Sequence, residues 1–210
     1  MPYGRFWLNL GIVGVPWPAP FHPETLFMPH NSNRFFVLTG GPGSGKTTLI
    51  ERLSAAGYAT SVEAGRGIIR DQVAISGTAL PWHDRALFAE LMLSWEMRSH
   101  AIAAATPGRV FFDRGVPDVI GYLRLIGLPV PAYVEQAARE FRYNRKVFIL
   151  PHWPEIFAQD SERKQDEDEA RRTHASMVAT YAACGYELVE VPKARVDDRL
   201  AFILDNTRQA

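Results

Sequence analysis

From residue 34 onward, short apolar runs alternate with longer segments whose apolar residues recur every three or four positions. Short apolar runs predict buried strands, and the recurring spacing predicts amphipathic helices. The five runs that predict strands are residues 34–38, 58–62, 109–112, 146–150 and 186–191. Because strands that alternate with helices form parallel sheets with right-handed crossovers, the pattern predicts an α/β fold with a five-stranded parallel sheet.

The longest predicted helix runs from about Asp84 to the break at Pro107-Gly108. Its apolar positions are expected to face the core, and they are Leu87, Phe88, Leu91, Met92 and Trp95. Gly57 and Gly185 follow two other predicted helices, as glycines that end helices commonly do. Shorter helices are predicted at 117–125 and 131–141, and a last helix passes through 196–204.

Residues 1–33 differ in composition from the rest of the chain. Proline interrupts the apolar residues here at positions 2, 16, 18, 20, 23 and 29. Proline density of this kind forbids a regular helix or a central strand. Arg5 before a short apolar run is typical of a secretory signal, but glycine and proline break the run and no small-residue cleavage site follows. We therefore expect an extended or disordered extension at 1–33, with a start at Met28 as an alternative, and one domain over 34–210.

Composition limits the classes of partner. The 210 residues suffice for one α/β domain, and 23 basic and 23 acidic residues leave no net charge. The net charge of the chain therefore does not indicate nucleic acid or an anionic membrane as a partner. Any attraction for phosphate must come from a local group of positive charges. Cys184 is the single cysteine, which excludes an internal disulfide and is compatible with a cytoplasmic protein. The oligomeric state stays open.

A complete G-x-x-x-x-G-K-[ST] motif follows the first predicted strand. It reads Gly40-Gly41-Pro42-Gly43-Ser44-Gly45-Lys46-Thr47, and Thr48 comes next. The glycines let successive backbone N–H groups turn inward around a phosphate chain, and the helix that starts near Lys46 adds its positive end. A flexible Gly/Ser loop is the alternative, but the intact spacing and the strand and helix on either side favour a nucleotide-binding loop formed by these nine residues.

Three side chains are candidates for handling ATP and Mg²⁺. Lys46 is expected to reach the β- and γ-phosphates, and the Thr47 hydroxyl to bind Mg²⁺. Asp113 follows three apolar strand residues, as a Walker B aspartate does, and is expected to contact Mg²⁺ directly or through water. The alternative role of Asp113 is to cap the next helix. The six histidines lack the spacing of a metal site.

The segment Asp113-Arg114-Gly115-Val116-Pro117-Asp118, with Tyr122 and the phosphate loop, resembles small P-loop kinase-type NTPases. More narrowly, the chain resembles the compact AAA-type group that includes the ribosylnicotinamide kinase domain of NAD regulatory proteins, and more distantly thymidylate and deoxynucleoside kinases. The resemblance covers roughly residues 34–205, and the phosphate loop is its most specific motif. It implies a three-layer P-loop NTPase fold with a small helical lid at about 152–172.

The resemblance also implies roles for charged residues. It implies that Glu63 accepts the acceptor's proton or helps to place Mg²⁺, and that Arg66, Arg114 and Asp118 contact the substrate. A glutamate at a helix start is the alternative for Glu63, and a helix cap is the alternative for Asp118. It implies that Arg163 of the lid closes over the phosphates, and Arg171 is the second, weaker candidate for this role. From the residues alone, the charged stretch 159–172 is equally well explained as a solvated helix face.

Three function classes remain. The first is an ATP- and Mg²⁺-dependent kinase that acts on an unidentified small molecule, with a hydroxyl or phosphate as acceptor. The second is an ATPase or nucleotide-dependent switch that acts on a protein partner. Arg114 stands where many AAA-type motors have an acidic residue, and no guanine-reading N-K-x-D motif occurs, which disfavours the standard versions of this class. The third is a nucleotide-binding scaffold that docks through residues 1–33.

Overall fold

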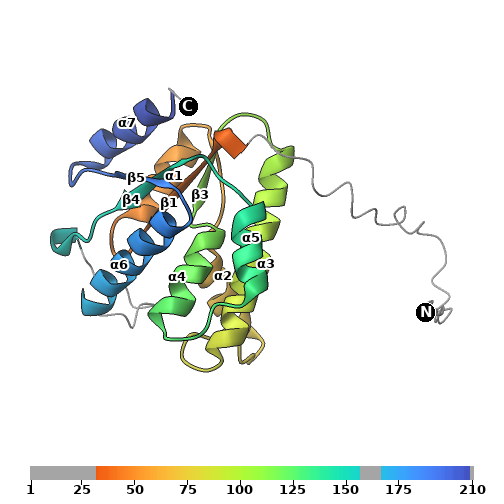
Figure 1. Cartoon of the computed structure of the whole chain (residues 1–210). Coiled ribbons are helices and arrows are strands. Elements are labelled where there is room, and N and C mark those ends of the chain that lie inside the picture. Colours follow the sequence, from red (N-terminus) through yellow and green to blue (C-terminus); the bar gives the residue numbers. More distant parts are fainter. Residues whose placement is uncertain (1–31, 157–166, 209–210) are drawn as a thin grey trace, which may run out of the picture. The chain divides into compact units, whose positions relative to one another are not determined.

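The computed structural model describes residues 32–156 and 167–208 (Figure 1). All of these residues belong to one compact unit, Asn31–Ala210. Of the predicted extension, only Ser32 and Asn33 are described, in the 3₁₀ turn η2 (Ser32–Arg34). The predicted lid residue Arg163 lies outside the described residues.

Five strands form one parallel sheet in the order β2-β3-β1-β4-β5. Their bounds are β1 (Phe35–Gly40), β2 (Ala59–Thr60), β3 (Val110–Asp113), β4 (Lys146–Leu150) and β5 (Glu187–Glu190). The predicted five-stranded parallel sheet is confirmed. β1 lies at its centre, paired with β3 on one side and β4 on the other.

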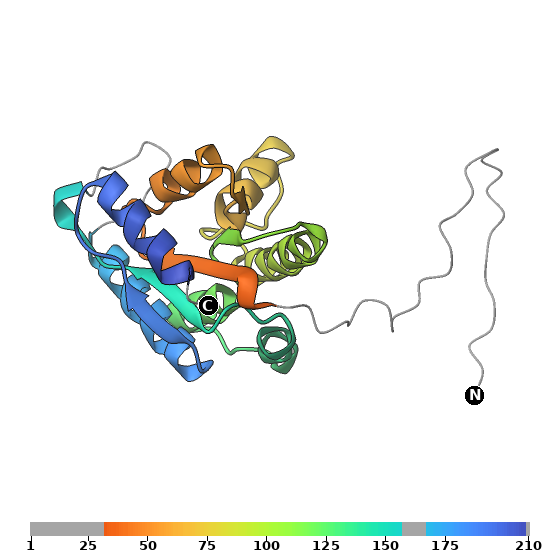
Figure 2. The same cartoon turned by 90° about the horizontal axis from the view of Figure 1, so that it is seen from above.

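Helices connect the strands and cover both faces of the sheet (Figures 1 and 2). They are α1 (Lys46–Ala55), α2 (Ala64–Ala74), α3 (Arg85–Ala105), α4 (Val116–Leu125), α5 (Ala132–Glu140), α6 (Glu167–Ala183) and α7 (Val196–Thr207), with a 3₁₀ turn η3 (Pro154–Ile156). Among the described residues, no helix has the length and apolar character needed to cross a membrane.

The alternation of side chains along β1 explains the three layers. Phe36 and Leu38 pack in one cluster with side chains of α1 and α7. Phe35 and Val37 pack in another with Ala103 of α3 and with side chains of α6. Because successive strand residues point to opposite faces, an all-apolar strand buried on both faces needs helices on both sides. The predicted three-layer α/β fold is thereby confirmed.

The side of α3 that faces the core differs from the prediction. Phe88 and Met92 are buried as expected, but Leu87 is 42% exposed, so the prediction for Leu87 was wrong. The buried stripe instead continues at intervals of four residues through Glu96 and His100. Phe88 packs edge-on against Tyr122 of α4, while Leu87, one residue earlier, lies at the margin of the buried side.

Arg34 joins the start of β1 to the end of α3. Its guanidinium donates to four backbone carbonyls, those of Ala103, Ala104, Thr106 and Gly108. The last carbonyls of a helix have no partner within the helix, so these hydrogen bonds satisfy groups that otherwise need water. Arg34 therefore caps α3 from a position about 70 residues earlier in the chain.

We predict that Arg34→Ala lowers the free energy of unfolding by about 2 kcal/mol, because several charge-assisted hydrogen bonds are lost together. Urea denaturation measures the change. Arg52→Ala is the matched control, since Arg52 pairs with Asp197 on the surface and exposed pairs contribute about 0.5 kcal/mol or less. Equal losses in the two variants would contradict the capping role.

Candidate functional site

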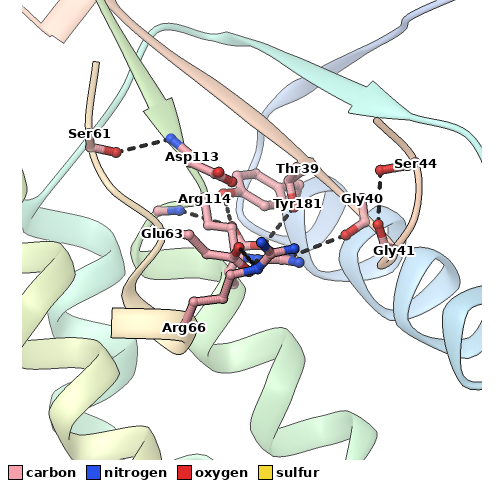
Figure 3. Close-up of polar contacts among 12 residues, drawn as sticks. Thr39, Gly40, Gly41, Ser44, Ser61, Glu63, Arg66, Asp113, Arg114 and Tyr181 are labelled. Atoms are coloured by element: carbon pink, nitrogen blue, oxygen red, sulfur yellow. Dashed lines mark hydrogen bonds and ion pairs between the residues drawn. The ribbon is translucent and has the colours of Figure 1, made fainter. Parts of the chain in front are cut away.

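The predicted site residues come from neighbouring strands that end at one edge of the sheet. β1 ends at Gly40, and Leu38 lies in register with Asp113 at the end of β3. The chain beyond β2 reaches Glu63 immediately before α2. Figure 3 shows these side chains converging below the ends of the strands. The carboxyl edge of a parallel sheet is where ligands bind in this class of fold.

The phosphate loop is held in a fixed shape between β1 and α1. Gly45 has a φ of 80°, in the left-handed region, and directly precedes α1 without a side-chain cap. The first N–H groups of α1 are therefore left for an anion. A Cβ at Gly41 would lie 2.4 Å from the Ala170 carbonyl oxygen, so only glycine lets α6 approach the loop this closely. Ser44 Oγ donates to the Gly41 carbonyl at 2.9 Å and closes the loop.

Lys46 and Asp113 are two buried ionisable residues next to the loop. Lys46 is 6% exposed and Asp113 is 4% exposed. Burial and the nearby Arg114 lower the pKa of Lys46, against the attraction of Asp113 and Glu63. Burial raises the pKa of Asp113, and Lys46 opposes that shift. Each charge therefore favours the ionised form of the other and opposes the effect of burial.

Asp113 Oδ1 is buried and has no hydrogen-bond partner among the described residues. The backbone N–H of Asp113 donates to Ser61 Oγ at 3.0 Å, which fixes the end of β3 against the chain leaving β2. Asp118, rather than Asp113, accepts the Gly115 N–H at the start of α4. The helix-capping alternative for Asp113 is therefore not the arrangement observed, and its free oxygen faces the site.

Arg114 has an unusual backbone conformation, and its side chain makes hydrogen bonds to three other residues. Its φ of 74° lies in the left-handed region, which a non-glycine residue rarely adopts. Its guanidinium contacts Gly40 O at 3.2 Å, Asp118 Oδ1 at 3.1 Å and Glu63 Oε1 at 3.3 Å. Burial alone would lower the pKa of Arg114, but the surrounding carboxylates raise it. Arg114 therefore stays charged and spans the gap between the phosphate loop and α2.

Glu63 is ionised because cations surround it. Its two oxygens pair with Arg66 at 3.1 Å and with Arg114 at 3.3 Å. Burial alone would raise the pKa of Glu63, but Arg114, Lys46 and Arg66 outweigh burial and lower it. Glu63 occupies the N-cap position of α2 without a side-chain capping bond, so its carboxylate is directed to the arginines. The structure thus brings Glu63, Arg66 and Arg114 together.

Asp118 is a buried junction between three elements. Its carboxylate accepts hydrogen bonds from Thr39 Oγ1 at 2.6 Å, Tyr181 Oη at 2.6 Å, the Gly115 N–H and Arg114. A carboxylate accepts about four hydrogen bonds, so its capacity is used. Asp118 was expected either to contact the substrate or to cap a helix, and the bond from the Gly115 N–H shows that it caps α4. We expect Asp118 to hold Arg114 in place rather than to contact a substrate.

Sequence reasoning missed Glu96, a third buried carboxyl near the site. Glu96 is 1% exposed and neither of its oxygens has a partner among the described residues. Burial, reinforced by Asp118 and Asp113, raises its pKa well above the ordinary value. The sequence feature that could have identified Glu96 is its position four residues after Met92, on the buried side of α3. Thr39 and Tyr181 were also missed, because neither carries a local motif.

The predicted lid is described only at its borders. η3 lies near its start, and residues 167–172 form the first turns of α6. Arg171 pairs with Asp168 on the exposed surface of that helix. The structure therefore does not bring Arg171 to the site, and the role of Arg163 stays a prediction.

A cavity of about 520 Å³ adjoins the site at the edge of the sheet. Its walls come from β2, α2 and α3, and include Ile68, Trp95 and Arg98. Ser61 lines its end, where its hydroxyl accepts the Asp113 N–H. Its volume is that of a small-molecule pocket, and none of the predicted site residues lines it.

A phosphate loop between the central strand and the first helix of a parallel sheet, with an aspartate at the end of the adjacent strand, is the arrangement of a P-loop NTPase. The chain belongs to the family described as AAA domain, whose model matches residues 35–199. No curated protein sequence matches the chain.

Solved structures share the fold. NadR protein, in complex with NR, is 16% identical with a TM-score of 0.65, and the match covers 85% of this chain and 50% of NadR. The chain thus spans about half the length of NadR. Deoxyadenosine kinase from M. mycoides is 13% identical with a TM-score of 0.60, and the match covers 84% of this chain and 100% of the kinase. Thymidylate kinase from Ehrlichia chaffeensis is 14% identical with a TM-score of 0.56, at coverages of 84% and 99%.

We predict that Glu96→Gln stabilises the protein increasingly as pH rises above the ordinary carboxyl pKa of 4.5. The folded-state pKa of Glu96 is raised, so above the unfolded-state pKa the folded protein must hold a proton that the unfolded chain releases. Wild-type stability therefore falls with rising pH by about 1.4 kcal/mol for each unit of pKa shift, and glutamine removes this loss. Urea denaturation at several pH values measures the difference, with the exposed Glu51→Gln as control. A difference independent of pH would contradict the prediction.

Proposed function

We propose that this protein is an ATP- and Mg²⁺-dependent phosphotransferase that moves the γ-phosphoryl group to a hydroxyl of a small molecule. One observation carries the proposal: an intact phosphate loop, a buried lysine, a buried aspartate and a glutamate paired with two arginines meet at one edge of the sheet. Phosphoryl transfer depends chiefly on positioning and on fixed charge, and this arrangement provides both.

The triphosphate is proposed to bind in the loop from Gly40 to Thr48. The unsatisfied N–H groups at the start of α1 and the Lys46 ammonium are the donors for its oxygens. Lys46 is already buried near Asp113 and Glu63, whose charges favour its ammonium form, so little reorganisation is needed when the nucleotide arrives. The proposed lid residue Arg163 would complete the cation set from outside the loop.

The residues at the base of the loop fit Mg²⁺. Asp113 Oδ1 is a buried carboxylate oxygen without a partner among the described residues, and hard oxygen donors are what Mg²⁺ prefers. Thr47 supplies the hydroxyl of the phosphate-loop motif. When bound, Mg²⁺ neutralises charge on the β- and γ-phosphate oxygens. Asp113 would hold the ion or a water bound to it.

The charge balance favours a hydroxyl over a phosphate as acceptor. Arg114 is compensated by Glu63 and Asp118, and Arg66 by Glu63. Among the described residues at this end of the site, each guanidinium already has a carboxylate, and an acceptor phosphate would meet the negative charge of Glu63. An acceptor hydroxyl instead can donate its hydrogen bond to the ionised Glu63. We propose Glu63 as the base, with Arg66 and Arg114 fixing its position.

The body of the acceptor is proposed to occupy the cavity between β2, α2 and α3. Its volume of about 520 Å³ suits a metabolite, and its end at Ser61 adjoins Asp113. The solved structures with the same fold include a nucleoside kinase and a nucleotide kinase, which supports a nucleoside-like acceptor. Residues 1–33 are proposed to be an extension that this chemistry does not need.

The experiment that tests the function is a thermal-shift screen of nucleosides, vitamins and sugars with Mg²⁺ and AMP-PNP, followed by assay of γ-phosphate from ATP with each hit. A bound acceptor stabilises the protein by mass action. Transfer of the phosphoryl group to a hit supports the kinase. Hydrolysis that requires a protein partner, with no transfer, would instead establish the regulatory ATPase.

We predict that Lys46→Ala lowers turnover on the order of 10²-fold or more, because a fixed charge at the transferring phosphate is lost. Steady-state kinetics measure the loss. Lys193→Ala, at an exposed lysine before α7, is the control and should retain wild-type turnover. Turnover unchanged in Lys46→Ala would refute the assignment of the loop.

We predict that Glu63→Gln lowers the rate of transfer by roughly 10²-fold while AMP-PNP affinity changes by less than about threefold. Glutamine keeps the shape of the side chain but cannot take the proton. Calorimetry and a transfer assay measure the two quantities, and Glu51→Gln is the control. An equal loss of affinity and rate would mean that Glu63 serves nucleotide binding instead.

A further inference from the structure

Arg199 lies on the last helix, yet it contacts the phosphate loop. Its Nη2 donates to the Ser44 carbonyl oxygen at 3.1 Å, across 155 positions of the sequence. The side chain is among the largest that are fully buried, with 2% of the residue exposed. Its guanidinium lies 5.5 Å from the centroid of the Trp153 ring, just beyond β4. Arg199 thus joins α7, the segment after β4 and the phosphate loop.

The charge of Arg199 is uncompensated among the described residues. No carboxylate pairs with it there, and Nε is buried without a hydrogen-bond partner. Burial lowers its pKa, with no acidic group opposing the shift. An unpaired buried charge is costly, and folded proteins normally pair it or do without it. Arg114 is a contrasting case, because its largely buried guanidinium is paired with the carboxylates of Glu63 and Asp118.

The hydrogen bond to Ser44 fixes one peptide plane of the loop. In a trans peptide, the carbonyl of one residue and the N–H of the next point in opposite directions. Holding the Ser44 carbonyl toward Arg199 therefore turns the Gly45 N–H away from Arg199. Gly45 is the left-handed residue directly before α1, where the N–H groups are free to bind an anion.

We infer that Arg199 is a positioning residue for nucleotide binding, which orients the Ser44–Gly45 peptide and carries a positive charge whose counter-ion is the bound triphosphate. The inference rests on the proposed function, because it requires that a nucleoside triphosphate occupies the loop. It accounts for the cost of the buried charge, since a cation left unpaired behind an anion site strengthens binding at the expense of the unliganded fold.

The test compares Mg²⁺–AMP-PNP and AMP binding to wild type, Arg199→Met, Arg199→Lys and Arg195→Met by calorimetry at low ionic strength. Arg195 is the matched control, because it lies one turn earlier, is exposed and pairs with Asp198. Arg199→Met should weaken AMP-PNP binding roughly tenfold and AMP binding less, since the lost attraction scales with ligand charge. Arg199→Lys should recover part of the affinity, and Arg195→Met should match wild type.

Thermal unfolding without nucleotide separates this role from simple packing. Arg199→Met should melt at or above the wild-type temperature, because it removes an unpaired buried charge. A lower melting temperature in Arg199→Met, together with no recovery in Arg199→Lys, would overturn the inference, and so would equal losses for AMP and AMP-PNP. Failure of wild type to bind AMP-PNP would instead refute the proposed function itself.

Discussion

Compensation of buried charge at the carboxyl edge of the sheet is the constraint on which the site depends. Lys46 and Arg114 are removed from water, and Glu63, Asp113 and Asp118 keep them charged. Such a cluster is stable only if every member has a partner, because a single uncompensated charge in a low-dielectric site costs several kcal/mol. The same pairing presents the charges to a ligand in fixed positions, so the protein need not rearrange them when a ligand binds.

The fold brings segments that are distant in the sequence into contact around this cluster of charges. Asp118 connects the end of β1 through Thr39, α4 through Gly115 and α6 through Tyr181. α6 in turn packs against the loop so closely that a side chain at Gly41 would collide with the backbone of Ala170. The first turns of α6 belong to the predicted lid. A movement of α6 would therefore displace groups both at the loop and at the carboxylate that holds Arg114.

The sequence was sufficient for the fold and for the residues that follow the strands. Apolar runs and glycine breaks predict strands and helices locally, and parallel strands bring Gly40 and Asp113 to one edge without further information. The exact rotation of α3 was not predictable, because its apolar residues span a broad face and the sequence does not show which part of that face is buried. Phe88 packs against Tyr122, and Leu87, at the margin of the face, is exposed. Arg199 and Tyr181 act through partners far away in the sequence, which periodicity does not reveal.

A crystal structure with Mn²⁺ and AMP-PNP tests the central claim most directly, because the anomalous signal of Mn²⁺ locates the ion independently of the nucleotide. The account predicts one Mn²⁺ between the Thr47 hydroxyl and Asp113, directly or through water, with the triphosphate in the loop from Gly40 to Thr48 and Lys46 on its terminal phosphates. A triphosphate bound outside the loop, or an ion with no contact to Asp113 or its waters, would contradict it.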